Sequence, residues 1–310
     1  MEQTDQIDLI EQLGISTEDA AFLQQVLNEV DVSGALYALD GSEIRVDAGP
    51  AVITDTLIQQ ANSNDVLQKI PSEDNDVTSR FSSAIWYEKI QQQTVVLAGV
   101  GGIGSYVAFL LSRMHPSSIY IYDDDTVETV NLSGQMFSRD DVGSLKVVAT
   151  AASMRSFSDY GDVFAINTKF TESSQPGNIM ICGFDNMAAR KTFFKRWCDH
   201  VKSFADVSDR AKCLYIDGRL AAESFQVLCI RGDDPYSIEK YSDHWLFNDD
   251  EAEETICSYK QTSFCANMIA SVMVNCFVNF IANQCNPLIP RDVPFLTEYD
   301  ASMMFFKTES

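Results

Sequence analysis

The segment GVGGIGS follows a short apolar run, residues 95–98, and places Gly99, Gly101 and Gly104 in a G-x-G-x-x-G spacing. Gly99 permits a tight turn, Gly101 lets a phosphate approach the backbone, and Gly104 lets a helix pack closely on a strand. A helix that begins here offers unpaired amide groups and a partial positive charge to an anion. These glycines, with Gly102 among them, predict a phosphate-binding turn between a buried strand and a helix.

A carboxylate follows at the distance that such a turn requires. Residues 119–122 have the pattern of the next strand, and Asp123 comes directly after them. A carboxylate about 20 residues beyond the glycines can hold a ribose hydroxyl. Strand, helix, strand and carboxylate occur in this order, so we predict a nucleotide site. The glycine turn alone does not choose among NAD, FAD, S-adenosylmethionine and ATP.

The polar residues after Asp123 help to distinguish among these candidate ligands. Asn131, Gln135 and Lys146 lie in a polar segment that leads into the next helix, and Asp185 follows another apolar strand. The carboxyl ends of neighbouring parallel strands converge on one crevice. We therefore expect the carboxylates to meet near the phosphates with Lys146 as their countercharge. Such a set suits phosphate chemistry better than hydride transfer.

A triphosphate held among carboxylates implies a divalent cation. Asp123, Asp125 and Asp185 offer oxygen ligands, which Mg²⁺ prefers. The residues therefore indicate Mg²⁺ beside a bound triphosphate.

Segments of strand and helix character alternate after residue 80, which predicts an α/β fold with a doubly wound, mostly parallel, Rossmann-like sheet. We expect further helices over residues 142–157 and 186–204, and further strands near 163–167, 179–183, 213–217 and 226–230.

The first 77 residues differ from the rest in charge. They contain sixteen acidic and two basic residues, and PSEDNDVTS at their end has the composition of a linker. Within them, residues 34–47 predict a hairpin with a turn at Asp40-Gly41. We divide the chain into a small acidic accessory region, residues 1–77, and a nucleotide-binding domain, residues 78–310.

With these motifs the chain resembles the ThiF/MoeB/ubiquitin-activating superfamily, ATP-dependent adenylyltransferases that act on the C-terminal carboxylate of ubiquitin-like or sulfur-carrier proteins. The matching phrases are GVGGIGS, DDDTVETVNLSGQ, DVGSLKV and CGFDNMAARK, in family order over residues 80–196. In texture the chain is most similar to the short ThiF-like proteins of large bacteriophages. The resemblance also implies homodimers and a ubiquitin-like or sulfur-carrier protein or peptide as the partner.

The resemblance implies a role for each residue of the site. Asp123 would hold the ribose, Lys146 would neutralise charge on the α-phosphate, and Asp185 would hold Mg²⁺ with Asp125 beside it. Positioning and charge neutralisation supply most of the acceleration in such a step. The other residues of the implied ATP site are Gly99, Gly101, Gly102, Gly104, Asn131, Gln135 and Arg80.

Two positions depart from the family pattern. Relatives usually read N-L-x-R-Q, with an arginine on the phosphates, where this chain has Gly134. A segment that resembles R-Y-x-R-Q keeps Arg80 but has Ser83 at the second arginine. Losing one transition-state arginine without replacement costs about 10³-fold or more, by analogy with phosphoryl transfer. Either Arg80, Arg113 or Arg139 substitutes, or the protein is an ATP-binding scaffold without catalysis.

Two further alternatives stay open. One is an adenylating dehydratase or sulfurtransferase-type member that acts on a small or RNA-borne carboxylate, and a more distant one is a nicotinamide-dependent dehydrogenase. The net charge, 22 − 45 = −23, opposes a nucleic-acid partner.

Cys257 is the candidate nucleophile. Relatives place a thioester cysteine in a loop that leads to a helix, and a helix start with Lys260 nearby would lower a thiol pKa. The alternative is a cysteine that fills a gap, with Cys265 equally available. The eight cysteines begin at Cys182 and include no C-x-x-C pair, so we expect no structural zinc, reduced thiols and a cytoplasmic location.

Residues 261–290 contain no charged side chain. Their length would suffice for a membrane span. However, polar residues recur every four positions and form a ridge on one helix, which is costly in lipid. We expect a buried helix in a core or a symmetric interface. The ridge consists of Ser263, Asn267, Ser271, Asn275, Asn279 and Asn283.

Overall fold

The computed structural model describes residues 34–37, 43–46, 78, 80–247 and 261–310. The chain forms two compact units, Met1–Ser72 and Glu73–Ser310. In the first unit, β1 (Gly34–Tyr37) and β2 (Glu43–Val46) form an antiparallel pair, which confirms the predicted hairpin. Its predicted turn, Asp40-Gly41, lies outside the described residues.

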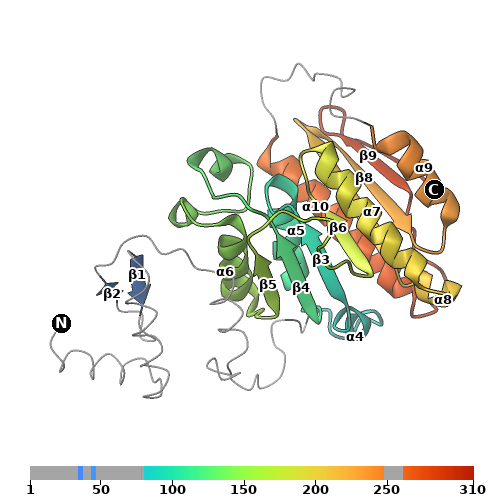
Figure 1. Ribbon diagram of the computed structural model, residues 1–310, viewed down its shortest axis with the longest axis horizontal. Coiled ribbons are helices and arrows are strands. Elements are labelled where there is room, and N and C mark those ends of the chain that lie inside the picture. Colours follow the sequence, from blue (N-terminus) through green and yellow to red (C-terminus); the bar gives the residue numbers. More distant parts are fainter. Residues whose placement is uncertain (1–33, 38–42, 47–77, 79, 248–260) are drawn as a thin grey trace. The chain divides into compact units, whose positions relative to one another are not determined.

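An eight-stranded sheet forms the second unit, in the order β10-β9-β8-β7-β6-β3-β4-β5 (Figure 1). The run β5-β4-β3-β6-β7 is parallel, whereas β8, β9 and β10 join it antiparallel. This arrangement confirms the predicted mostly parallel α/β sheet. The strands are β3 (Thr94–Ala98), β4 (Ser118–Tyr122), β5 (Val163–Ile166), β6 (Ile179–Cys182), β7 (Leu214–Ala221), β8 (Ser224–Arg231), β9 (Leu296–Asp300) and β10 (Phe305–Glu309).

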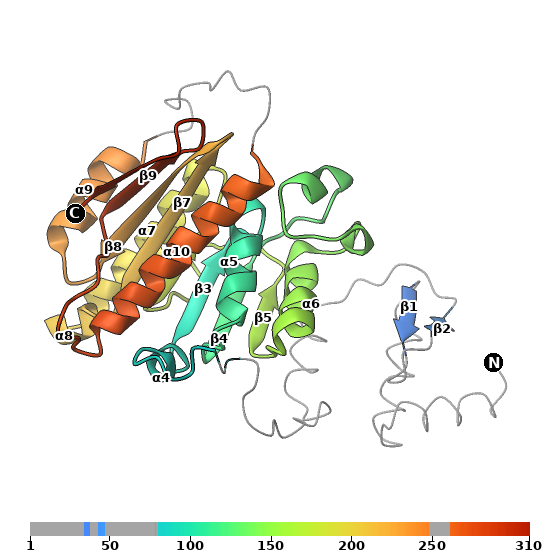
Figure 2. The ribbon, with the colours of Figure 1, turned by 180° about the vertical axis from the view of Figure 1, so that it is seen from behind.

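Helices cover both faces of this sheet (Figures 1 and 2). On β3, Val95 and Leu97 pack into the core beneath α5, α6 and α10, whereas Val96 and Ala98 pack into the core beneath α7 and α9. A parallel strand buried on both faces is continuously apolar for this reason. The helices are α4 (Tyr87–Ile90), α5 (Gly102–Ser112), α6 (Lys146–Ser158), α7 (Met187–Ser203), α8 (Val207–Arg210), α9 (Pro235–Trp245) and α10 (Ser263–Asn283).

The expected helix over residues 142–157 begins later than predicted. Gly143 has a φ of +93°, which a helix interior excludes, and α6 starts at Lys146. The expected strands near 213–217 and 226–230 are longer than predicted, because Leu214–Ala221 and Ser224–Arg231 pair along their full length as a hairpin.

The helix α10 is long and apolar enough to cross a membrane by length and composition, and half of its most apolar stretch is buried inside the protein. It packs against α5 and the hairpin of β7 and β8 through Ile269, Met273 and Phe277, among others. The expected packing of this helix in a core is confirmed for its apolar face, and a symmetric interface over its polar face stays a prediction. The first four ridge residues are exposed, and Asn279 and Asn283 donate hydrogen bonds to the carbonyls of Asp292 and Arg291.

We expect Gly104→Ala to destabilise the protein by about 1–3 kcal/mol, the usual cost of overpacking. A Cβ on Gly104 would lie 1.8 Å from the carbonyl oxygen of Gly99, where only backbone can move. Denaturant unfolding measured by circular dichroism checks this. Gly161→Ala is the matched control, because a Cβ there meets nothing within 4 Å, and it should change stability by less than about 0.5 kcal/mol. Equal unfolding free energies for the two variants would contradict the packing argument.

Candidate nucleotide site

The glycine turn lies where the sheet changes direction. Strand β3, which comes first along the chain, lies in the middle of the parallel run, with β4 on one side and β6 on the other. The crevice between the carboxyl ends of these strands is the topological switch point of the sheet. The amide of Gly99 donates to the carbonyl of Tyr122 at 2.8 Å, and that of Gly183 donates to Ala98 at 2.8 Å. Gly99 has a φ of +82°, and a Cβ on it would lie 2.8 Å from the backbone of Gly183. The sharp turn therefore requires glycine.

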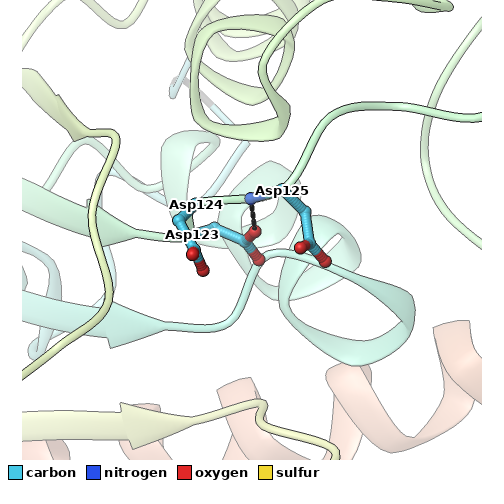
Figure 3. Close-up of side chains that lie close together, drawn as sticks. All are labelled: Asp123, Asp124 and Asp125. Atoms are coloured by element: carbon cyan, nitrogen blue, oxygen red, sulfur yellow. Dashed lines mark hydrogen bonds between the residues drawn. The ribbon is translucent and has the colours of Figure 1, made fainter.

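Asp123 holds this turn in place. One carboxylate oxygen accepts the Val100 amide at 2.9 Å, and the other accepts the Asp125 amide at 2.9 Å (Figure 3). Burial raises the pKa of the Asp123 carboxyl above its ordinary value, an effect that the two amides and nearby Lys146 partly oppose. Asp123 is therefore fixed beside the glycine turn, where the sequence placed the ribose carboxylate.

Lys146 is buried and carries its charge into the same region. As the first residue of α6, it donates its backbone amide to the Asp125 carbonyl at 2.9 Å. Its Nζ lies 2.7 Å from Asp125 Oδ2, and the Lys146 side chain is 9% exposed whereas that of Asp125 is 65% exposed. The backbone and side-chain contacts together direct the ammonium toward the end of β4.

Three consecutive aspartates form a cluster, Asp123, Asp124 and Asp125, whose ligand atoms all lie within 4.8 Å of one another (Figure 3). Each already has a partner: two amides for Asp123, Lys169 at 3.8 Å for Asp124, and Lys146 for Asp125. Oxygen donors of this kind suit Mg²⁺.

Asp185, the predicted metal ligand, lies two residues past the Gly183 that touches the glycine turn. It is exposed, and its Oδ1 accepts a hydrogen bond from Asn186 Nδ2 at 3.2 Å. Asn186 in turn caps α7, because its Oδ1 accepts the Ala189 amide at 2.9 Å. The site therefore offers this carboxylate to a cation from the β6 side of the crevice.

Of the two side-chain amides predicted for the ATP site, Asn131 and Gln135, only Gln135 lies beside the glycine turn. The Gln135 side chain lies beside Gly101, about 4 Å from where a Cβ on Gly101 would be, and its buried Oε1 has no hydrogen-bond partner among the described residues. Asn131 has a local role, since its Oδ1 accepts the Glu128 amide at 2.8 Å in the capping box of a 3-10 turn, Thr129–Ser133. A buried acceptor without a partner marks a position where a ligand donor fits.

The three arginines that were expected to substitute for the missing family arginines lie in different parts of the domain. Arg80 is exposed in the turn before α4, which leads into the amino end of β3, whereas the glycine turn follows its carboxyl end (Figure 1). Arg113 stacks over Phe109 at the far end of α5, and Arg139 is exposed. The structure therefore brings neither Arg80 nor Arg113 to the glycine turn within one chain. Cys257 lies outside the described residues.

A buried ionic network, which the sequence did not reveal, braces the Asp185 loop. Arg190 of α7 pairs with Asp217 of β7 and donates to the carbonyl oxygen of Phe184, next to Asp185. Asp217 is fully buried. The phrase DNMAAR was a signal for Arg190, and DGR for Asp217, but only the parallel pairing of β6 with β7 brings them together.

Asp217 also accepts hydrogen bonds through its second carboxylate oxygen. Its Oδ2 accepts Arg219 Nε at 2.8 Å and the Tyr241 hydroxyl at 2.9 Å. Arg219 also donates to the carbonyl of Trp245 at 2.7 Å and lies over the rings of Tyr241 and Trp245. Asp217 and Arg219 therefore form an ion pair within one strand, β7.

Gln261 is the other residue that sequence reasoning missed. Its side chain packs against Gly102 and donates to the carbonyl oxygen of Gly134 at 3.2 Å. The glycine at position 134, where relatives carry arginine, was the available signal that another side chain fills this space.

A glycine turn at the switch point of a doubly wound sheet, with a fixed carboxylate after the second strand, defines a Rossmann-type domain. The ThiF family model matches residues 72–309, and the chain belongs to the ThiF family.

Curated relatives are ubiquitin-like modifier-activating enzymes. The chain is 28% identical over 165 residues to ubiquitin-like modifier-activating enzyme 5 of Drosophila willistoni, which covers 44% of the chain and 41% of the relative. It is 38% identical over 68 residues to the Drosophila melanogaster enzyme of the same name, covering 22% and 17%. The matched part thus spans less than half the length of these relatives.

Solved structures share the fold. PaaA superposes with a TM-score of 0.59 at 15% identity, over 82% of the chain and 91% of PaaA. E. coli MccB with AMPCPP and MccA superposes with a TM-score of 0.58 at 17% identity, over 84% of the chain and 80% of MccB.

We expect Asp217→Asn to destabilise the protein by about 3–5 kcal/mol, because it leaves the buried guanidinium of Arg190 and the mostly buried one of Arg219 without their countercharge. Thermal or denaturant unfolding measures the effect. Asp209→Asn removes an exposed partner of Lys212 and should cost less than about 1 kcal/mol. Similar losses in both variants would show that the network does not brace the fold.

Proposed function

We propose that this protein activates the C-terminal carboxylate of a ubiquitin-like or sulfur-carrier protein or a peptide by ATP-dependent adenylylation. The observation that carries the proposal is the buried Lys146 ammonium beside Asp123 and the glycine turn. A fixed cation at this place can neutralise charge on an α-phosphate. Family membership and the ubiquitin-activating relatives support the same chemistry.

The reaction brings two anions together. A carboxylate oxygen attacks the α-phosphorus, a new phosphorus–oxygen bond forms, and the bond to the bridging oxygen breaks so that pyrophosphate leaves with its electron pair. The amides at the start of α5 would bind phosphate, Asp123 would hold the ribose, and Lys146 would stabilise the charge that develops. Gln135, with its unpaired oxygen, would accept a hydrogen bond from the bound nucleotide or an ordered water.

Mg²⁺ fits this donor set, because Asp185 and the aspartate cluster are oxygen ligands at the carboxyl edge of the sheet. Bound there, the ion would neutralise the triphosphate and orient the leaving pyrophosphate. Asp185 is the ligand that we favour, because its exposed carboxylate accepts from the neutral Asn186 side chain, whereas Asp123 accepts two backbone amides and Asp124 and Asp125 lie beside lysines.

A peptide or a small carrier protein is the substrate class that we favour. MccB, which shares the fold, has been determined with ATP and with N-formylated MccA. Homodimers and a cytoplasmic location remain predictions from the sequence, as does transfer of the acyl group to Cys257.

A catalytically inactive scaffold is the second candidate. Gly134 and Ser83 replace two arginines of the family pattern, and Arg80 is not brought to the glycine turn within one chain. Such a protein would bind ATP without pyrophosphate exchange. A dehydratase or sulfurtransferase-type member would instead act on a different carboxylate substrate. It would catalyse ATP–pyrophosphate exchange without a peptide.

Lys146→Ala is expected to lower ATP–pyrophosphate exchange about 10²–10³-fold, the usual cost of removing one group that stabilises developing charge. Lys212→Ala is the control, because this exposed lysine also pairs with an aspartate, Asp209, at 2.7 Å but lies before the amino end of β7. We expect Asp185→Ala to lower exchange by at least about 10-fold through weaker metal binding, whereas exposed Asp199→Ala does not. Unchanged exchange in both Lys146→Ala and Asp185→Ala would remove the assignment.

The form of the substrate terminus gives an independent test. Pyrophosphate release measured against a panel of carrier proteins and peptides should depend on a free C-terminal carboxylate. The same peptide with a C-terminal carboxamide should be inactive, because an amide nitrogen lacks the nucleophilic oxygen anion. Equal release from both forms would argue against attack by the terminus, and ATP binding with no release from any substrate would favour the scaffold.

A further inference from the structure

Gln261 places a carboxamide at the start of α5, from a part of the chain far from the glycine turn in sequence. An ideal Cβ on Gly102, in the first turn of α5, would lie 2.2 Å from Gln261 Oε1. An ideal Cβ on Gly134 would lie 2.6 Å from Gln261 Nε2. The side chain thus occupies space that only two glycines leave free.

The backbone of Gln261 is fixed on both sides. A parallel bridge joins it to Ala222, which turns β7 into β8 with a φ of +54°. The next residue, Thr262, is the N-cap of α10, and its Oγ1 accepts the Cys265 amide at 3.4 Å. With the main chain held in this way, the side chain extends to Gly134, where Nε2 donates to the carbonyl at 3.2 Å.

We propose that Gln261 is a nucleotide-positioning residue that contacts the phosphates of ATP, and this inference rests on the proposed function. It stands beside Gly102 at the amino end of α5, where the helix offers amides to an anion. A carboxamide nitrogen carries two donor hydrogens, and Gly134 takes one of them. The second is available to a phosphate oxygen.

Gln135 completes the arrangement. Its side chain lies beside Gly101 as that of Gln261 lies against Gly102, so two carboxamides border the same turn. Within the part of the chain that the structure describes, the buried Gln135 Oε1 lacks a hydrogen-bond partner, which independently marks this border as a place that a ligand or water completes. Gly134 exposes its carbonyl to Gln261 and, by having no side chain, makes room for it.

The test compares ATP affinity, measured by calorimetry with MgCl₂, among full-length variants. Gln261→Glu has the same shape but adds a negative charge, and it should weaken ATP binding about 10-fold or more by repulsion of the phosphates. Gln261→Ala removes one neutral donor and should weaken it only about 3-fold. Gln93→Glu is the matched control, because this half-buried glutamine also donates to a backbone carbonyl, that of Lys89, but lies before the amino end of β3.

A second measurement uses the space around Gly134. Gly134→Ala should displace the Gln261 amide and weaken ATP binding as much as Gln261→Ala, and the double variant should be no weaker than either single one. Additive losses, equal losses for Gln261→Glu and Gln261→Ala, or wild-type affinity in Gln261→Glu would each overturn the role of Gln261. Failure of the wild-type protein to bind ATP would instead overturn the proposed function, and the inference with it.

Discussion

The close contact between the ends of β3 and β6 is the constraint on which the site depends. Gly99, Gly104 and Gly183 allow these backbones to approach so closely that none of the three positions leaves room for a Cβ. Asp123 then fixes the turn from β4 by accepting the Val100 amide. Three parallel strands therefore end against one another, and the start of α5 points at the crevice that they form.

The buried ion pair of Arg190 and Asp217 supports this contact from the side of β7. Arg190 connects α7, the carbonyl of Phe184 and buried Asp217, so the loop that carries Asp185 is tied to β7 and not only to its own strand. Arg219 extends the same pairing to α9. A buried ion pair is weak evidence for stability but holds a specific geometry when every charge is paired. Here that geometry holds the loop that carries Asp185 at the carboxyl end of β6.

Local patterns predicted the parallel strands, the glycine turn and Asp123, whose carboxylate accepts an amide of that turn. They predicted these because strand ends in a parallel sheet meet at one edge. The sequence did not predict that the polar ridge of α10 is exposed within one chain, because four-residue spacing fixes which residues share a face but not which face the core covers. Gln261 was missed since its contacts with Gly102 and Gly134 join segments more than 120 residues apart in sequence, and no local pattern encodes them.

For the proposed function a chain of net charge −23 would have to bind a polyanion, and the structure offers local charge compensation for this. Each aspartate of the cluster has its own partner: amides for Asp123, Lys169 for Asp124 and Lys146 for Asp125. Neighbouring charges within a few ångström act far more strongly than distant surface charges, which salt screens. The net charge of the whole chain therefore does not exclude a phosphate ligand, because the amides of α5 and the buried Lys146 lie at the crevice itself.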